Sequence, residues 1–152
     1  PEEAKLRRLG QRYLRLDALS ESESKASGIF FQAPVPIQEV RGLMREAEVV
    51  VMSSDGGEGW GAVVNEAMAE GCCMIGTHEA GSSATLIEHG VNGYLYRTGD
   101  VSELANLLRQ LDQESIRSCG ERARETLDSV WSPEHAADKL IERMTNTSSR
   151  LG

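Results

Sequence analysis

The stretch from Val49 to Ile75 reads VVVMSSDGGEGWGAVVNEAMAEGCCMI and predicts a strand, a loop, a helix and a second strand. Val49–Met52 is a run of four apolar residues, which is typical of a strand buried on both faces. Small residues follow, and then comes a helix that carries Glu66 and ends at Gly71, a suitable C′ cap. Cys72–Ile75 is a second short apolar strand. This order predicts an α/β fold with a parallel sheet.

The flanking sequence continues the alternation on both sides. We expect helices at residues 2–16, 37–47, 81–90, 101–111, 114–128 and 133–145, and further strands at residues 28–32 and 94–96. Ser132 and Pro133 are suitable as the N-cap and first residue of the last helix. We expect one truncated domain, residues 1–152, with a disordered tail at residues 146–152. In parallel sheets, ligands bind beyond the carboxyl ends of the strands, which directs attention to the loops after Gln32, Met52 and Ile75.

Length and composition describe a soluble globular domain. The chain has 152 residues, of which 39% are hydrophobic and 26% charged, and these are ordinary values. The net charge of −8 argues against a general surface for nucleic acids or anionic membranes. Cys72, Cys73 and Cys119 have neither the number nor the spacing of a disulfide framework or a metal site. We therefore predict a cytoplasmic protein without a metal.

Two carboxylates, Glu58 and Glu66, bracket the start of the predicted central helix. Buried without partners, they would cost free energy, so we infer a ligand rich in hydroxyl groups. The backbone amides from Gly61 to Val64 have no acceptor inside the helix and favour an anion such as phosphate. Hydroxyl groups and phosphate together indicate a nucleotide sugar. From these residues alone, a flexible loop with a solvated acidic helix end is an equally good interpretation.

Several spaced motifs around the two glutamates resemble the donor-binding signature of retaining glycosyltransferases with the GT-B fold, family 4 (glycosyl transferases group 1). That family shows a small-residue loop, Glu-Gly-Phe-Gly and a second Glu eight positions after the first; here Trp60 replaces the Phe. Other similar segments are FQAPVP at residues 31–36, EAMAEG at residues 66–71, Gly81-Ser82 in place of a Gly-Gly pair, EHGVNGYL at residues 88–95 and TGD at residues 98–100. The resemblance covers residues 28–145.

The resemblance implies a Rossmann-like, doubly wound parallel sheet that is part of the C-terminal domain of a GT-B fold. Glu58 would be the catalytic residue and bind hydroxyls of the donor sugar, because an ionised carboxylate accepts two such hydrogen bonds well. The implied donor-binding residues are Glu66, Gly59, Trp60, Gly61, Ala62, Val63, Val64, Ala33, Pro34 and Val35. Of these, Glu66 would bind the ribose, amides 59–61 the sugar, amides 62–64 the diphosphate, and the turn 33–35 the base.

The implied function is transfer of a hexose from a nucleoside-diphosphate sugar to a hydroxyl acceptor with retention, without a cofactor. The acceptor would be a saccharide or a lipid-linked molecule, bound through an N-terminal domain that these residues lack. We therefore expect the fragment alone to be inactive, and Pro1 as first residue fits a piece of a longer chain. No nucleic acid partner is expected, and peripheral membrane association of the parent protein is left open.

Some features depart from the family pattern and leave alternatives. The loop before Glu58 is one residue longer than usual, Ala84-Thr85 stand where Pro-Glu is common, and the family's basic phosphate-binding loop is absent. The main alternative is a non-catalytic nucleotide-sugar-binding module or an inactive paralogue. A GT-B-like epimerase or phosphorylase and a response-regulator-like domain are further alternatives, although the lysines that a phosphorylase and a response regulator need are not evident. Trp131 is interpreted as a packing anchor for the last helix.

Overall fold

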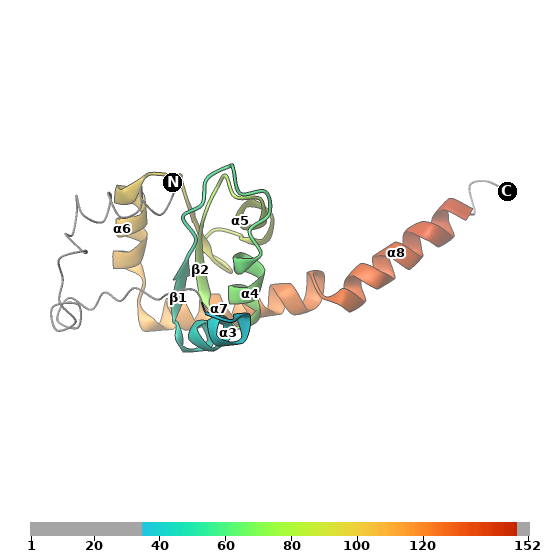
Figure 1. Ribbon diagram of the computed structural model, residues 1–152, viewed down its shortest axis with the longest axis horizontal. Helices are drawn as coiled ribbons and strands as arrows, with labels where there is room; N and C mark the ends of the chain where they lie inside the picture. Colours follow the sequence, from blue (N-terminus) through green and yellow to red (C-terminus); the bar gives the residue numbers. More distant parts are fainter. Residues whose placement is uncertain (1–34, 149–152) are drawn as a thin grey trace. The chain divides into compact units, whose positions relative to one another are not determined.

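The computed structural model describes residues 35–148, which form strands flanked by helices (Figure 1). The helices are α3 (Ile37–Glu46), α4 (Val63–Ala69), α5 (Gly81–Leu86), α6 (Val101–Gln110), α7 (Gln113–Val130) and α8 (Pro133–Ser148), and the strands are β1 (Val49–Val51), β2 (Cys73–Thr77) and β3 (Tyr94–Tyr96). All of them belong to one compact unit that begins at Pro36. The expected helix at residues 2–16 and strand at residues 28–32 lie outside the described residues.

The three strands form one parallel sheet in the order β1-β2-β3. Val50 is in register with Met74, and Ile75 is in register with Tyr94. Helices α4, α5 and α7 contact β2, whereas α6 contacts β3. In Figure 1, α6 lies on the other side of the strands from α4 and α5. The predicted α/β fold with a parallel sheet and helices on both faces is therefore confirmed.

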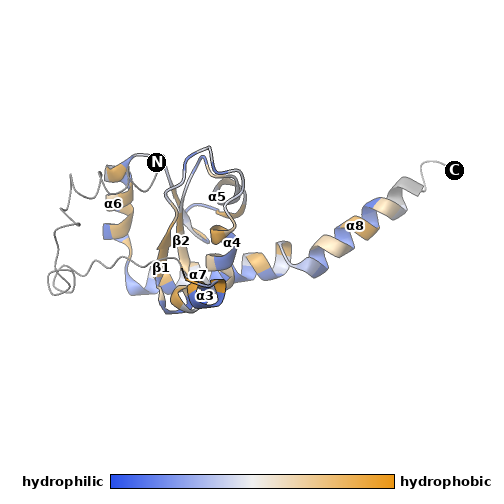
Figure 2. Cartoon of the chain, viewed as in Figure 1, coloured by the Kyte–Doolittle hydropathy of each residue, from blue (hydrophilic) through white to orange (hydrophobic). Residues whose placement is uncertain are grey.

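Strand β2 lies at the centre of the hydrophobic core. All five of its residues are buried, and Figure 2 shows β1 and β2 as hydrophobic segments. Strand β1, which was expected to be buried on both faces, is only half-buried and exposes Val51. The core consists of Met44, Met52, Val64, Ala67, Met68, Cys72, Met74, Ala80, Leu86, Ile87, Leu95, Ala123 and Leu127. These side chains come from the strands and from α3, α4, α5 and α7, so the core fixes these helices on the sheet.

Two helix ends follow the local signals that predicted them. Helix α4 ends in a Schellman motif, in which Gly71 has a φ of +83° and its N–H donates to the Met68 carbonyl at 3.1 Å. The N–H of Cys72 completes the motif by donating to the Ala67 carbonyl at 3.0 Å. At the start of α8, the Ser132 hydroxyl accepts a backbone N–H of the first turn at 3.1 Å. Both predicted caps are confirmed.

Two other helix ends differ from the prediction. The helix expected at residues 81–90 ends at Leu86, because the side chain of Asn92 organises the chain that follows. Its amide donates to the Leu86 carbonyl at 3.0 Å, and its carbonyl accepts the Glu88 N–H at 2.7 Å. Helix α8 continues to Ser148, past the expected end at residue 145 and into the segment expected to be disordered. Polar residues such as Thr, Asn and Ser lower helix propensity only slightly, so they do not by themselves end a solvent-exposed helix.

The carboxylate of Glu70, which follows α4, ties α4 to α3. It accepts hydrogen bonds from Arg45 Nε and Arg41 Nε, both at 2.7 Å, and only 9% of its side chain is exposed. The hydrogen bond from Arg45 is the largest of the effects that lower the pKa of Glu70 below its ordinary value of 4.5. Because the pKa is lower in the folded state, the ion pairs stabilise the fold above pH 4.5, and this stabilisation is lost as the pH falls through the lowered pKa.

We predict that Glu70→Gln lowers the melting temperature at neutral pH and that its difference from the wild type shrinks as the pH falls below 4.5. Thermal unfolding followed by circular dichroism over this pH range measures the effect. Glu121→Gln is the matched control, since Glu121 pairs with Arg117 at 2.9 Å but is 61% exposed, and such a pair contributes little. A difference for Glu70→Gln that does not change with pH would contradict this account of the cluster.

Candidate functional site

The loops at the carboxyl ends of the strands are tied together into one rim. The Thr77 hydroxyl, at the end of β2, donates to the Ser54 carbonyl in the loop after β1. The Glu79 carboxylate, in the loop after β2, accepts the Thr98 hydroxyl at 2.7 Å and the Thr98 N–H at 3.2 Å, in the loop after β3. The hydroxyl hydrogen bond is the main cause that lowers the pKa of Glu79. The loops after β1 and β3 are thus hydrogen-bonded to the end of β2 and the loop after it; the loop after Gln32 lies outside the described residues.

The glycine loop, Gly56–Gly61, is held in place by the start of helix α5. The Ser82 N–H donates to the Trp60 carbonyl and the Ser82 hydroxyl to the Gly61 carbonyl, each at 2.8 Å. Gly61 has a φ of +80°, which glycine adopts without strain. A Cβ atom on Gly81 would overlap the carbonyl oxygen of Gly59. Gly81 therefore allows the backbone of α5 to approach the glycine loop closely, and the hydrogen bonds of Ser82 hold the two segments together.

Five successive backbone N–H groups, from Gly59 to Val63, have no acceptor among the residues that the structure describes. They lie between the glycine loop and the first turn of α4, where the helix dipole also favours negative charge. The Val64 N–H, which was predicted to be free, is not. It donates to the Gly61 carbonyl at 3.2 Å and so closes a turn at the start of the helix. The arrangement is suited to binding an anion through residues 59–63 and not through Val64.

The two glutamates lie on the surface side of this region. Glu58 is exposed, and Glu66 is half-buried in the first turn of α4. The premise that both are buried is wrong, because α4 turns Val64, Ala67 and Met68 into the core and leaves Glu66 on its flank. Neither carboxylate has a hydrogen bond or ion pair with another described side chain. Both are therefore free to accept hydrogen bonds from a ligand.

Trp60 carries the largest side chain of the glycine loop. Its indole N–H donates to Asn65 Oδ1 at 2.8 Å, and its ring centroid is 5.3 Å from that of Trp131. The sequence indicates no role for Ser82, Asn65 or Trp131 in this region. The only signal for Ser82 was its place beside Gly81, and no local signal pairs two tryptophans that are far apart in the chain.

The structure does not test the three residues implied to frame a base. Ala33 and Pro34 lie outside the described residues, and Val35 belongs to the separate unit Pro1–Val35. Within residues 35–148, no group of three His, Cys, Asp or Glu side chains is arranged to hold a metal ion. No helix in that range combines the length and the apolar character that crossing a membrane requires.

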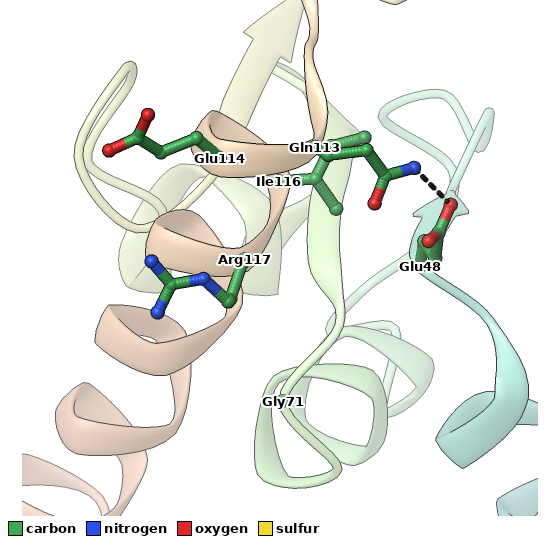
Figure 3. Close-up of a pocket in the computed structure, with 6 residues that line it drawn as sticks. All are labelled: Glu48, Gly71, Gln113, Glu114, Ile116 and Arg117. Carbon is green, nitrogen blue, oxygen red and sulfur yellow. Dashed lines mark hydrogen bonds between the residues drawn. The ribbon is translucent and has the colours of Figure 1, made fainter.

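A hollow of about 450 Å³ lies at the opposite end of the strands from the glycine loop (Figure 3). It is lined by Glu48, Gly71, Gln113, Glu114, Ile116 and Arg117. Glu48 and Gly71 precede β1 and β2, so the hollow is at the amino ends of the strands. Gln113 donates to Glu48 at 3.2 Å, and Arg117 is paired with Glu121 at 2.9 Å. The side chains of Gln113 and Arg117 in the hollow are thus already paired with carboxylates, whereas the amides of residues 59–63 have no acceptor among the described residues.

A family model described as glycosyl transferases group 1 matches residues 1–114. The chain belongs to this family. The matched range includes the glycine loop, both glutamates and Ser82. Membership supports the resemblance on which the roles of Glu58 and Glu66 were predicted.

Two curated relatives are longer proteins. An N-acetyl-alpha-D-glucosaminyl L-malate synthase of Bacillus anthracis is 39% identical over 87 residues, which are 56% of this chain and 22% of that protein. An exopolysaccharide phosphotransferase of Streptomyces coelicolor is 30% identical over 118 residues, which are 76% of this chain and 12% of that protein. The chain therefore spans less than a quarter of the length of either relative.

Several solved structures have the same fold. The C-terminal domain of a glycosyl transferase group 1 family protein from Francisella tularensis is 26% identical with a TM-score of 0.64, over 80% of this chain and 65% of that one. Anabaena HepE in complex with UDP-glucose is 24% identical with a TM-score of 0.72, over 95% of this chain and 38% of that one. Sucrose-phosphate synthase from Thermosynechococcus elongatus is 21% identical with a TM-score of 0.74, over 98% and 35%. The predicted C-terminal GT-B domain fold is confirmed.

Proposed function

We propose that this chain is the donor-binding domain of a retaining, family 4 glycosyltransferase. The enzyme would transfer a hexose from a nucleoside-diphosphate sugar to a hydroxyl of a saccharide or lipid-linked acceptor. The observation that carries the proposal is the run of free amides at residues 59–63 beside Glu58 and Glu66, in a chain of the glycosyl transferases group 1 family. The complex of Anabaena HepE with UDP-glucose supports a nucleotide sugar as the ligand.

The anionic part of the donor would lie against the glycine loop and the start of α4. The N–H groups of Ala62 and Val63 donate to the diphosphate, and those of Gly59, Trp60 and Gly61 contact the sugar. Each interaction of an anion with a helix start contributes about 0.3–1 kcal/mol. Because these groups are held in place before the donor arrives, binding loses little conformational entropy of the protein.

The two carboxylates have separate roles in this proposal. Glu66, in the first turn of α4, accepts hydrogen bonds from the ribose hydroxyls. Glu58, at the exposed glycine loop, accepts hydrogen bonds from hydroxyls of the donor sugar and is the proposed catalytic residue. Charge-assisted hydrogen bonds of this kind are about twice as strong as neutral ones. The turn at Ala33, Pro34 and Val35 would frame the base.

Retention follows if the acceptor attacks from the face that the diphosphate leaves. The bond from C1 to the diphosphate oxygen breaks, the acceptor oxygen bonds to C1 on the same face, and the acceptor proton passes to the departing diphosphate. No protein base, metal or cofactor takes part in this step. Glu58 holds the sugar during the exchange, and an N-terminal domain of the parent protein would bind the acceptor.

Calorimetry with UDP-glucose, UDP-N-acetylglucosamine, GDP-mannose and ADP-glucose tests the proposal. We expect the chain to bind at least one of these, and to bind the corresponding nucleoside without phosphate much more weakly. A transfer assay with the parent enzyme then separates a glycosyltransferase from a non-catalytic binding module. If none of the four donors binds, the proposed function is wrong.

Gly81→Ala is expected to lower the affinity for the bound donor by about tenfold while the domain stays folded. The added Cβ overlaps the Gly59 carbonyl oxygen, so the glycine loop must move away from α5. Overpacking of this kind costs about 1–3 kcal/mol, and about 1.4 kcal/mol corresponds to tenfold in affinity. Gly42→Ala is the control, since nothing lies within 4 Å of a Cβ there. Equal affinities of the two variants for the donor would contradict the role of Gly81.

A further inference from the structure

Trp60 and Trp131 contact each other across two separate segments of the chain. Their ring centroids are 5.3 Å apart, and the ring planes are inclined by 38°. Trp60 belongs to the glycine loop, whereas Trp131 is the residue that follows helix α7. We propose that Trp131 is a positioning residue, which acts through Trp60 to hold the glycine loop in the conformation that receives the donor. This inference rests on the proposed function.

Trp60 is held from three directions by three different elements. Ser82, in α5, donates its N–H to the Trp60 carbonyl at 2.8 Å. Asn65, in α4, accepts the indole N–H at 2.8 Å. Trp131, at the end of α7, packs against the indole ring in a tilted arrangement. The two hydrogen bonds restrain one point of the backbone and one edge of the indole, and the aromatic contact restrains the plane of the ring.

Trp131 is attached to a helix, α7, that is itself tightly packed. Helix α7 packs on both α4 and β2. Its Gly120 lies so close to the Gly71 carbonyl oxygen that no Cβ atom fits between them. Leu127, one turn before Trp131, is 9% exposed, and its carbonyl accepts the Trp131 N–H at 3.1 Å. Trp131 therefore projects from the end of a helix that the core fixes in place.

The glycine loop depends on such a restraint because its backbone is intrinsically free. Gly59 and Gly61 flank Trp60, and glycine loses more conformational entropy on ordering than any other residue. The amides of Gly59 to Val63 must also stay without internal partners to receive an anion. An aromatic pair contributes enough to change an equilibrium by between about twofold and tenfold. Loss of Trp131 should thus weaken donor binding by this factor through loss of preorganisation.

Two measurements on the 152-residue chain test this role, with Trp131→Ala, Trp131→Phe and the neighbouring control Val130→Ala. Val130 is 49% exposed and is not one of the two rings, so its truncation removes apolar surface beside the pair and leaves both rings present. The first measurement is ¹⁵N relaxation of the amides of residues 59–63 without ligand, and the second is calorimetry with the donor selected above. For Trp131→Ala we expect order parameters to fall from about 0.85 towards 0.6 and the donor affinity to fall between about twofold and tenfold. Trp131→Phe keeps a ring and should restore most of both values.

Two outcomes would overturn the positioning role of Trp131. Unchanged relaxation in Trp131→Ala and Trp131→Phe overturns it, and so does a loss of affinity without a change in relaxation, because Trp131 would then act on the donor itself. If Trp131→Ala does not fold, Trp131→Leu, which removes the ring but keeps an apolar side chain, takes its place, and the loss relative to Val130→Ala is expected on the same two readouts. If relaxation changes as expected while the wild type binds no donor, the ordering role stands and the proposed function fails.

Discussion

Replacing Glu66 with alanine is expected to lower the affinity of the chain for its nucleotide sugar by about 100-fold or more. The half-buried carboxylate would accept two ribose hydroxyls, and each hydrogen bond to a charged group contributes about 1.5–3 kcal/mol. Calorimetry with the selected donor measures the loss. The fold should not change, because Glu66 has no hydrogen-bond or ion-pair partner among the described side chains.

Glu114→Ala is the matched control for this experiment. Glu114 is also a glutamate in the first turn of a helix, so its removal has the same effect on the helix dipole. It lies at the hollow on the amino side of the sheet, away from the rim. If Glu66→Ala binds the donor as tightly as Glu114→Ala does, Glu66 does not bind the ribose.

Gly120→Val is expected to lower the free energy of unfolding by about 3 kcal/mol. Already the first added carbon would overlap the Gly71 carbonyl oxygen, and this neighbour is backbone that cannot rotate away. Helix α7 would have to move off the end of α4, although Cys119 and Ala123 on either side of Gly120 are buried in its contact with the sheet and α4. Urea unfolding followed by circular dichroism measures the change.

The control for this substitution is Gly42→Val. Gly42 is also a glycine within a helix, α3, and nothing lies within 4 Å of a Cβ there. The two variants have the same change in helix propensity, so their difference isolates the close approach of α7 to Gly71. Equal free energies of unfolding for the two variants would contradict this prediction, because α7 would then shift away from Gly71 without a cost in stability.

The sequence predicted the central strands and helices because each is specified locally. The apolar run Val49–Met52 and the positive φ position at Gly71 need no knowledge of distant residues. The end of α5 at Leu86 was not predictable in this way, since it depends on hydrogen bonds from the side chain of Asn92. The sequence places Asn92 only in a turn, without indicating which carbonyl it reaches.

The candidate site was predicted through its motifs and not through its energetics. Glu58 is exposed and Glu66 only half-buried, contrary to the prediction, since the burial of a helix flank depends on which neighbours cover it. The free amides were predicted from the helix start, but the turn that uses the Val64 N–H was not. The contact of Trp60 with Trp131 arises only when α7 is packed against α4, so no local pattern contains it.

We propose that the amides of residues 59–63 and the carboxylate of Glu66 receive a nucleotide sugar. Titration of the ¹⁵N-labelled chain with the donor selected by calorimetry, followed by amide chemical shifts, tests it residue by residue. We expect the largest shifts at Gly59–Val63 and at Glu66. Shifts that are absent there, or that gather around Gly71 and Gln113 at the hollow, would contradict the account.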